Sequence, residues 1–201
     1  MEIMRYVIMA NGRGRRWGNY LGKSKHLIEI EGETLLQRTT RLVHEIDLTA
    51  EVYISSSSPA NEAAGATRHV PLHGEHELNR FCYELIAPHT CFLYGDTFYT
   101  KKALETIIAT PADPIMFFGN DRSIVAVKTT DETYFKSLLD TLFHKIETGE
   151  IDDAKGWDLH KMACDDALDA GKAIPFVHMD DITQDFNSPD DYLRFSHENA
   201  G

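Results

Sequence analysis

The chain has 201 residues, of which 32 are acidic and 20 are basic, so its net charge is −12 with histidine neutral. A hydrophobic content of 42% is enough for a sizeable core, and a single domain over residues 1–201 is the expected organisation. The acidic balance argues against nucleic acid or an anionic membrane as a partner, because both need a basic face. No apolar run approaches the ~20 residues that span a bilayer.

Cysteine usage indicates the compartment. The three cysteines, Cys82, Cys91 and Cys164, are odd in number and have no Cys-x-x-Cys spacing. This argues against a disulfide framework and against a structural zinc site, and it favours a reducing, cytoplasmic location. Cys82 and Cys91 lie on apolar faces, which is typical of core cysteines.

Hydrophobic periodicity predicts strands and helices in alternation. Buried strands are expected over residues 6–9, 52–54, 91–94, 115–118, 124–127 and 174–178, and residues 25–30 also alternate like a strand. Helices are expected over residues 35–46, 78–86, 104–108, 135–146 and 159–168, and after the N-cap Ser188 with Pro189 in the first turn. A hairpin is expected at residues 119–121. The pattern predicts an α/β fold with a mostly parallel sheet and helices on both faces.

The most informative segment is a glycine- and arginine-rich stretch, residues 9–18, directly after the first predicted strand. It contains three glycines, which let backbone N–H groups approach a polyphosphate, and three arginines, which are permanently charged phosphate donors. A phosphate ligand would explain this basic patch in an acidic chain, and the alternative is a solvated basic turn.

Two familiar phosphate-binding motifs nearly match this part of the sequence. The segment from Gly12 to Gly18 is one residue longer than the glycine fingerprint of dinucleotide-binding proteins. The segment from Gly18 to Ser24 is one residue shorter than the kinase-type phosphate loop.

A different pattern covers nearly the whole chain. The stretch from Val7 to Leu42, with Lys25 inside it, is followed by Gly95-Asp96 after a central strand and by Asp185-Phe-Asn-Ser-Pro-Asp-Asp-Tyr192 near the end. These three motifs, in this order, resemble the MobA-like NTP transferases and sugar-phosphate nucleotidyltransferases. The resemblance implies a Rossmann-like, GT-A-like sheet, an NTP and a small phosphorylated acceptor as substrates, and Mg²⁺ as cofactor.

The resemblance also implies roles for single residues. Arg16 matches the arginine that grips the β and γ phosphates, and Lys25 matches the lysine that neutralises the phosphates brought together in the reaction. Asp96 matches the metal aspartate, and Asp185 or Asn187 falls where a second metal ligand is expected. Nucleotide contacts are implied for Ala10, Asn11, Gly12, Arg13, Gly14 and Arg15. Asn11, Arg15 and Ser24 depart from the usual residues at their positions.

For other residues near the predicted site, both a functional and a structural role are consistent with the sequence. By the family's layout the segment 71–79 passes near the nucleobase, so Glu75, Glu77 or Asn79 could read base edges, and the alternative is a polar loop. Asp96 ends a buried strand at the carboxyl edge of the sheet, where α/β folds bind ligands, and Mg²⁺ accepts such a hard oxygen ligand. Its alternative role is that of a turn residue before the helix that follows Thr100. Trp157 either lines an acceptor pocket or anchors the start of a helix.

These features predict transfer of NMP from an NTP to a sugar 1-phosphate or a small alcohol phosphate, with release of pyrophosphate. Two alternatives stay open. One is a nucleotide-sugar-dependent glycosyltransferase, although the chain has no Asp-x-Asp triplet. The other is a nucleotide-binding module without turnover.

Overall fold

The computed structural model describes residues 3–12 and 14–199. Its centre is a seven-stranded sheet in the order β10-β8-β9-β6-β1-β4-β5, in which β9 alone among these seven strands runs against the others. The strands are β1 (Arg5–Met9), β4 (Glu51–Ser55), β5 (Thr67–His69), β6 (Thr90–Tyr94), β8 (Ile115–Gly119), β9 (Ile124–Thr129) and β10 (Phe176–His178). The predicted mostly parallel α/β sheet is confirmed.

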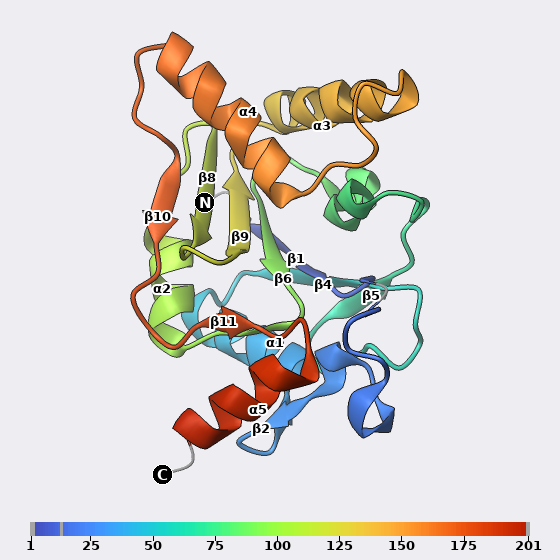
Figure 1. Ribbon diagram of the computed structural model, residues 1–201. Coiled ribbons are helices and arrows are strands. Elements are labelled where there is room, and N and C mark those ends of the chain that lie inside the picture. Colours follow the sequence, from blue (N-terminus) through green and yellow to red (C-terminus); the bar gives the residue numbers. More distant parts are fainter. Residues whose placement is uncertain (1–2, 13, 200–201) are drawn as a thin grey trace.

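Helices cover both faces of the sheet, as predicted (Figure 1). Alternate residues of the central strands point to opposite faces of the sheet, so the same strands contribute side chains to two separate cores, one on each face. One core packs against α3 (Glu132–Glu147) and α4 (Gly156–Asp169), and the other packs against α1 (Leu35–Ile46) and α2 (Lys101–Ala109). No helix among the described residues is both long and apolar enough to cross a membrane.

Two small sheets lie beside the main one. β2 (Glu29–Ile30) pairs with β3 (Glu33–Thr34), and β7 (Thr97–Phe98) pairs with β11 (Gln184–Asp185), both antiparallel. A third apolar cluster joins this region to the last helix, α5 (Pro189–Glu198), and includes Trp17, Phe98 and Phe186. The predicted N-cap is confirmed, since the hydroxyl of Ser188 accepts from the N–H of Asp191. The β7–β11 pair therefore brings the end of the chain to the centre of the sheet.

The structure corrects two predicted elements. Residues 78–86 form two 3₁₀ turns, η3 (Glu77–Phe81) and η4 (Tyr83–Leu85), because Cys82 between them has a left-handed backbone that an α-helix cannot contain. Residues 25–30 form a 3₁₀ turn, η2 (Lys25–Leu27), before the short strand β2. A further 3₁₀ turn, η1 (Tyr20–Gly22), lies earlier in the same loop.

Candidate active site

Two loops meet at the carboxyl edge of the sheet. The Gly-rich loop follows β1, and Gly95-Asp96 follows the neighbouring strand β6. The N–H of Gly95 donates to the carbonyl of Met9 over 3.0 Å, and a Cβ at position 95 would lie only 2.8 Å from that oxygen. Glycine is therefore required for this close approach. Within the first loop, Gly14 has a φ of 55°, which favours glycine as well.

A chain of polar contacts crosses the site. The ammonium of Lys25 contacts the Asp96 carboxylate and lies 3.5 Å from Oδ1 of Asn187. The amide of Asn187 donates to Asp185, whose other oxygen accepts from the hydroxyl of Ser123 over 2.9 Å. The β7–β11 pair holds the partners in place, with Asp185 opposite Thr97. Asp96 and Asn187 thus lie on either side of the same ammonium, and Asp185 contacts Asn187.

The two carboxylates respond differently to burial. Burial by itself would raise the pKa of Asp96, but the charge and hydrogen bond of Lys25, together with the nearby His26 and Arg80, outweigh it, so this pKa lies below its usual value. The pKa of Asp185 is raised, first by burial and then by the negative charge of Asp96. The carboxylates therefore repel each other across a site in which one lysine is the nearest cation. Such a pair of hard oxygen donors suits a divalent cation of the Mg²⁺ type.

His26 adds no charge at neutral pH. Its side chain is almost wholly buried, and burial lowers its pKa to about 4. Nδ1 lies 2.9 Å from the hydroxyl of Ser24. The residue after Lys25 therefore supports the loop as a neutral imidazole.

A cavity of about 300 Å³ surrounds this centre and is rich in cations. It is lined by six basic side chains: Arg15, Arg16, Lys25, Arg80, Arg122 and Lys155. Lys25 is paired with Asp96, and Arg80 is paired with Glu77 over 2.9 Å. The other four have no ion pair with any residue in 3–12 or 14–199. Since unpaired cations around a cavity attract anions, the site is built for a ligand of high negative charge.

The structure brings most of the predicted residues together. Gly12, Gly14, Arg15, Arg16, Lys25, Asp96, Asp185 and Asn187 all line this one cavity. Ala10 is buried at the end of β1, and its carbonyl accepts from the amide of Asn61 over 2.9 Å. Arg13 lies outside the described residues.

The predicted base-reading residues line a second cavity of about 330 Å³, which shares Gly12, Arg15 and Arg80 with the first. Asn11, Glu75, Glu77 and Asn79 all contribute to its wall. Asn79 also has a local role, because its Oδ1 accepts from the N–H of His76 over 2.8 Å and caps η3. Asn11 is held by the N–H and hydroxyl of Ser57, at 2.9 and 2.7 Å.

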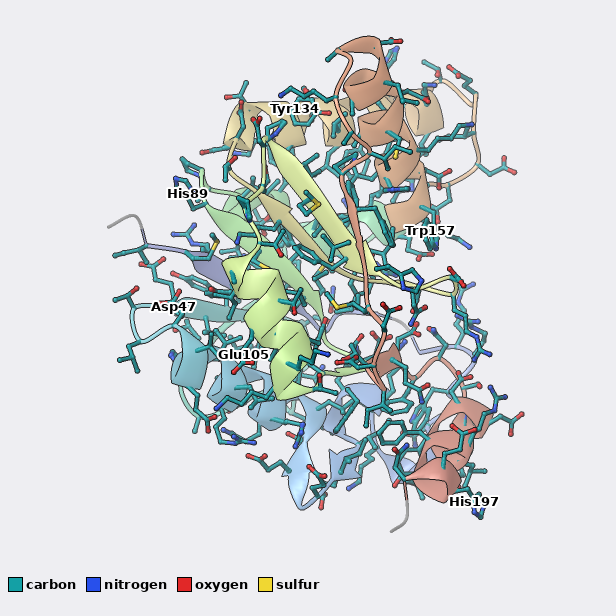
Figure 2. The ribbon with its side chains drawn as sticks, turned by 90° about the vertical axis from the view of Figure 1, so that its left-hand side faces the viewer. Asp47, His89, Glu105, Tyr134, Trp157 and His197 are labelled. Atoms are coloured by element: carbon teal, nitrogen blue, oxygen red, sulfur yellow. The ribbon has the colours of Figure 1, made fainter. Side chains whose placement is uncertain are left out.

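Three cations of the main cavity were not predicted from the sequence. Arg80 comes from η3, Arg122 from the turn between β8 and β9, and Lys155 from the residue before α4. A signal existed for the last two, since Arg122 follows the predicted hairpin turn and Lys155 precedes a predicted helix. Trp157 lies at the start of α4 (Figure 2), stacks on Phe176 and lines the cavity.

The first part of the chain matches a known protein family. Residues 6–80 match the model of the MobA-like NTP transferase domain. The predicted resemblance is confirmed. The matched segment includes the Gly-rich loop, Lys25 and all of the second cavity's lining residues except Asp153, and the match supports the expectation of an enzyme. No curated protein matches the chain in sequence.

Solved structures with the same fold extend over the whole chain. The CTP:phosphocholine cytidylyltransferase of Streptococcus pneumoniae is 10% identical, with a TM-score of 0.61 and coverage of 98% of this chain and 99% of that one. The 4-diphosphocytidyl-2C-methyl-D-erythritol synthase of Anaerococcus prevotii DSM 20548 is 13% identical, with a TM-score of 0.67 and coverage of 100% and 97%. The UTP-bound UGPase of Acinetobacter baumannii is 11% identical, with a TM-score of 0.65 and coverage of 98% and 93%. At these identities the likeness concerns the fold.

Proposed function

We propose that this protein transfers NMP from an NTP to a small phosphorylated acceptor and releases pyrophosphate. The observation that carries the proposal is the convergence of the Gly-rich loop, Lys25, Asp96 and the Asp185–Asn187 segment on one cation-lined cavity. The match of residues 6–80 to the MobA-like NTP transferase domain supports it. The solved neighbours include enzymes named for CTP and phosphocholine, which is the same pairing of an NTP with a phosphorylated acceptor.

In this proposal the triphosphate lies on the Gly-rich loop. A Cβ at position 12 would meet no protein atom within 4 Å, so the backbone there is open to a ligand. Arg15 and Arg16 line the same space, and neither forms an ion pair with a residue in 3–12 or 14–199. Backbone N–H groups and planar guanidinium groups together bind phosphate oxygens. Arg16 would grip the β and γ phosphates, which leave as pyrophosphate.

Lys25 would lie between the two reacting anions. The acceptor phosphate attacks the α-phosphorus in line, and the main cost is bringing two negatively charged groups together. Lys25 is nearly buried, so its charge acts in a medium of low dielectric and has more effect than it would in water. No covalent intermediate on the protein is required by this reaction.

The residues at the centre fit Mg²⁺. Asp96, Asp185 and Asn187 offer oxygen atoms close to one another, and the raised pKa of Asp185 beside Asp96 marks two carboxylates that a cation would stabilise. Mg²⁺ often takes only one or two protein carboxylates. When bound it would neutralise charge on the phosphates. Asp96 is the proposed first ligand, and Asp185 or Asn187, which contact each other beside it, is the proposed second.

The acceptor would enter from the opposite side of the cavity. Arg122 and Lys155 lie there, and α4 begins at Gly156 beside them. These two cations and the positive end of a 14-residue helix form an environment for a phosphate group. Trp157 lines the same side and is 42% exposed, so it offers an aromatic surface for the remainder of the acceptor.

The test is a matrix of four NTPs against sugar 1-phosphates and small alcohol phosphates, with Mg²⁺, read by pyrophosphate release. Acceptor-dependent release from one NTP supports the proposal. NTP binding without release in any combination would favour the module without turnover, and use of a sugar nucleotide as donor would favour a glycosyltransferase. Arg122→Ala and Lys155→Ala should raise the acceptor KM more than the NTP KM.

A further inference from the structure

A cluster of three metal-binding side chains lies outside the proposed active site. His69 ends β5, Cys82 separates η3 from η4, and Glu84 belongs to η4. The imidazole, thiol and carboxylate each offer one ligand atom, and these atoms all lie within 4.8 Å of one another. It is the one such group of three or more found among residues 3–12 and 14–199. We propose that His69, Cys82 and Glu84 bind a Zn²⁺ ion.

The donor set selects the metal. Nitrogen, sulfur and oxygen together suit a borderline-soft ion such as Zn²⁺, whereas Mg²⁺ and Ca²⁺ prefer oxygen alone. Bonds of ~2.0–2.3 Å place two ligands of a tetrahedral zinc ion roughly 3.3–3.8 Å apart. The three atoms are therefore already near the required spacing, and side-chain rotation supplies the remaining movement. Three protein ligands leave one position for water.

The surroundings suit an ion that enters from solvent. The thiol is buried, while the side chains of His69 and Glu84 are 30% and 22% exposed, so one wall of the cluster is open. His69 Nε2 and Glu84 Oε1 are 3.0 Å apart, and the same oxygen accepts from the N–H of Leu72 over 2.8 Å. A hydrogen bond from the backbone to a ligating carboxylate holds it in orientation. Cys82 would bind as a thiolate, and its proton would go to solvent.

The place of the cluster indicates what the ion would do. His69 lies before the loop that lines the second cavity, and Cys82 and Glu84 lie after it. Glu84 also holds that loop through Leu72. An ion bound to all three would join the two ends of the loop and restrict its motion. We expect it to stabilise the fold, and no step of nucleotide transfer requires it.

The lack of Cys-x-x-Cys spacing does not conflict with this site. That spacing supplies two sulfur ligands from one turn, whereas here a single cysteine meets a histidine and a glutamate. The three ligands span 16 positions, and only the folding of β5 against the 3₁₀ turns brings them together. Cys82 is therefore both a buried core residue and a proposed ligand.

The experiment uses the full chain, treated with chelator and titrated with Co²⁺ and Zn²⁺ without nucleotide. We expect one equivalent of Co²⁺ to produce a thiolate-to-cobalt charge-transfer band in the near ultraviolet. Cys82→Ser should abolish the band, and Cys91→Ser, a matched change at another buried cysteine, should keep it. Asp96→Asn should also keep it, because the active-site ligands contain no sulfur. A band of equal strength in Cys82→Ser, or no band in the wild type, would overturn the proposal.

A second pair of variants decides the matter if Cys82→Ser does not fold. His69→Asn and Glu84→Gln change partly exposed side chains and should fold. Each should weaken Zn²⁺ binding by ~100-fold or more, since even the loss of a group that only hydrogen-bonds to a metal ligand costs roughly 10–100-fold in affinity. A hundredfold excess of Zn²⁺ over its Kd should raise the wild-type Tm by roughly 5 °C or more and leave these variants little changed. Zn²⁺ affinity in either variant equal to that of the wild type would also overturn the proposal.

Discussion

Lys25→Met removes the cation that contacts Asp96 and keeps a similar apolar stem. The two side chains are only 10% and 12% exposed, so Asp96 would be left as a buried, unpaired carboxylate. Breaking a buried pair from one side costs about 3–5 kcal/mol of unfolding free energy. Lys23 offers a matched control two residues earlier. Its pair with Glu29, at 2.9 Å, is 37% and 56% exposed, and such surface pairs contribute about 0–1 kcal/mol.

Urea unfolding measures this difference without substrate. With an m-value of about 3 kcal/mol/M, Lys25→Met should lower the urea midpoint by roughly 1 M, and Lys23→Met should lower it by no more than about 0.3 M. Asp96→Asn combined with Lys25→Met should recover part of the loss, because the unpaired charge is then absent. Pyrophosphate release should fall by ~10²-fold or more in Lys25→Met and stay near wild type in Lys23→Met. Equal stability and equal activity of the two single variants would refute the assignment of Lys25.

The remaining predictions test other parts of the site. Gly12→Ala should keep the wild-type Tm and raise the NTP KM. Gly95→Ala should reduce the free energy of unfolding by about 1–3 kcal/mol, and so lower the Tm, because the added Cβ meets the Met9 carbonyl. Arg16→Ala should reduce kcat/KM by ~10²-fold or more with no loss of Tm, and wild-type turnover would remove Arg16 from the site. His26 is neutral in the folded state down to about pH 4, whereas in the unfolded chain it takes up a proton near pH 6.5. The free energy of unfolding should therefore fall by roughly 3 kcal/mol as the pH drops from about 6.5 to about 4. In His26→Gln this loss should be absent, and an unchanged pH profile of unfolding would contradict the reasoning.

The central residues of the site could be predicted because their signals are local. A buried strand followed by Gly and Asp places a carboxylate at the carboxyl edge whatever the rest of the chain does, and Asp96 lies there. The Gly-rich loop after β1 is equally local. Parallel neighbours β1 and β6 then bring the two together. Ordered motifs along the chain identified the partner segment at Asp185, but its register against β7 could come only from the folded structure.

Residues that act through long-range packing escaped prediction. Arg122 and Lys155 lie in unremarkable polar segments, and they face the cavity only because the β8–β9 turn and the start of α4 meet above it. Apolar spacing at residues 78–86 suits a helix, yet the left-handed backbone of Cys82 divides it into two turns. Lys25 and His26 are consecutive and both buried, which a strand with one solvent-exposed face does not allow. Periodicity records which residues are buried in regular elements, so it fails where a loop itself is buried.

The charge distribution explains how an acidic protein can bind a polyanion selectively. A net charge of −12 repels large anions such as nucleic acids over most of the surface. Instead, four cations that form no ion pair with another described residue, Arg15, Arg16, Arg122 and Lys155, line one cavity of about 300 Å³. Only a small and highly charged ligand can reach all of them at once. Arg15 and Arg16 come from the Gly-rich loop after β1, whereas Arg122 comes from the β8–β9 turn and Lys155 from the residue before α4. In the proposed reaction, one source of cations would bind the NTP and the other the acceptor phosphate, and Lys25 would neutralise charge where the two meet.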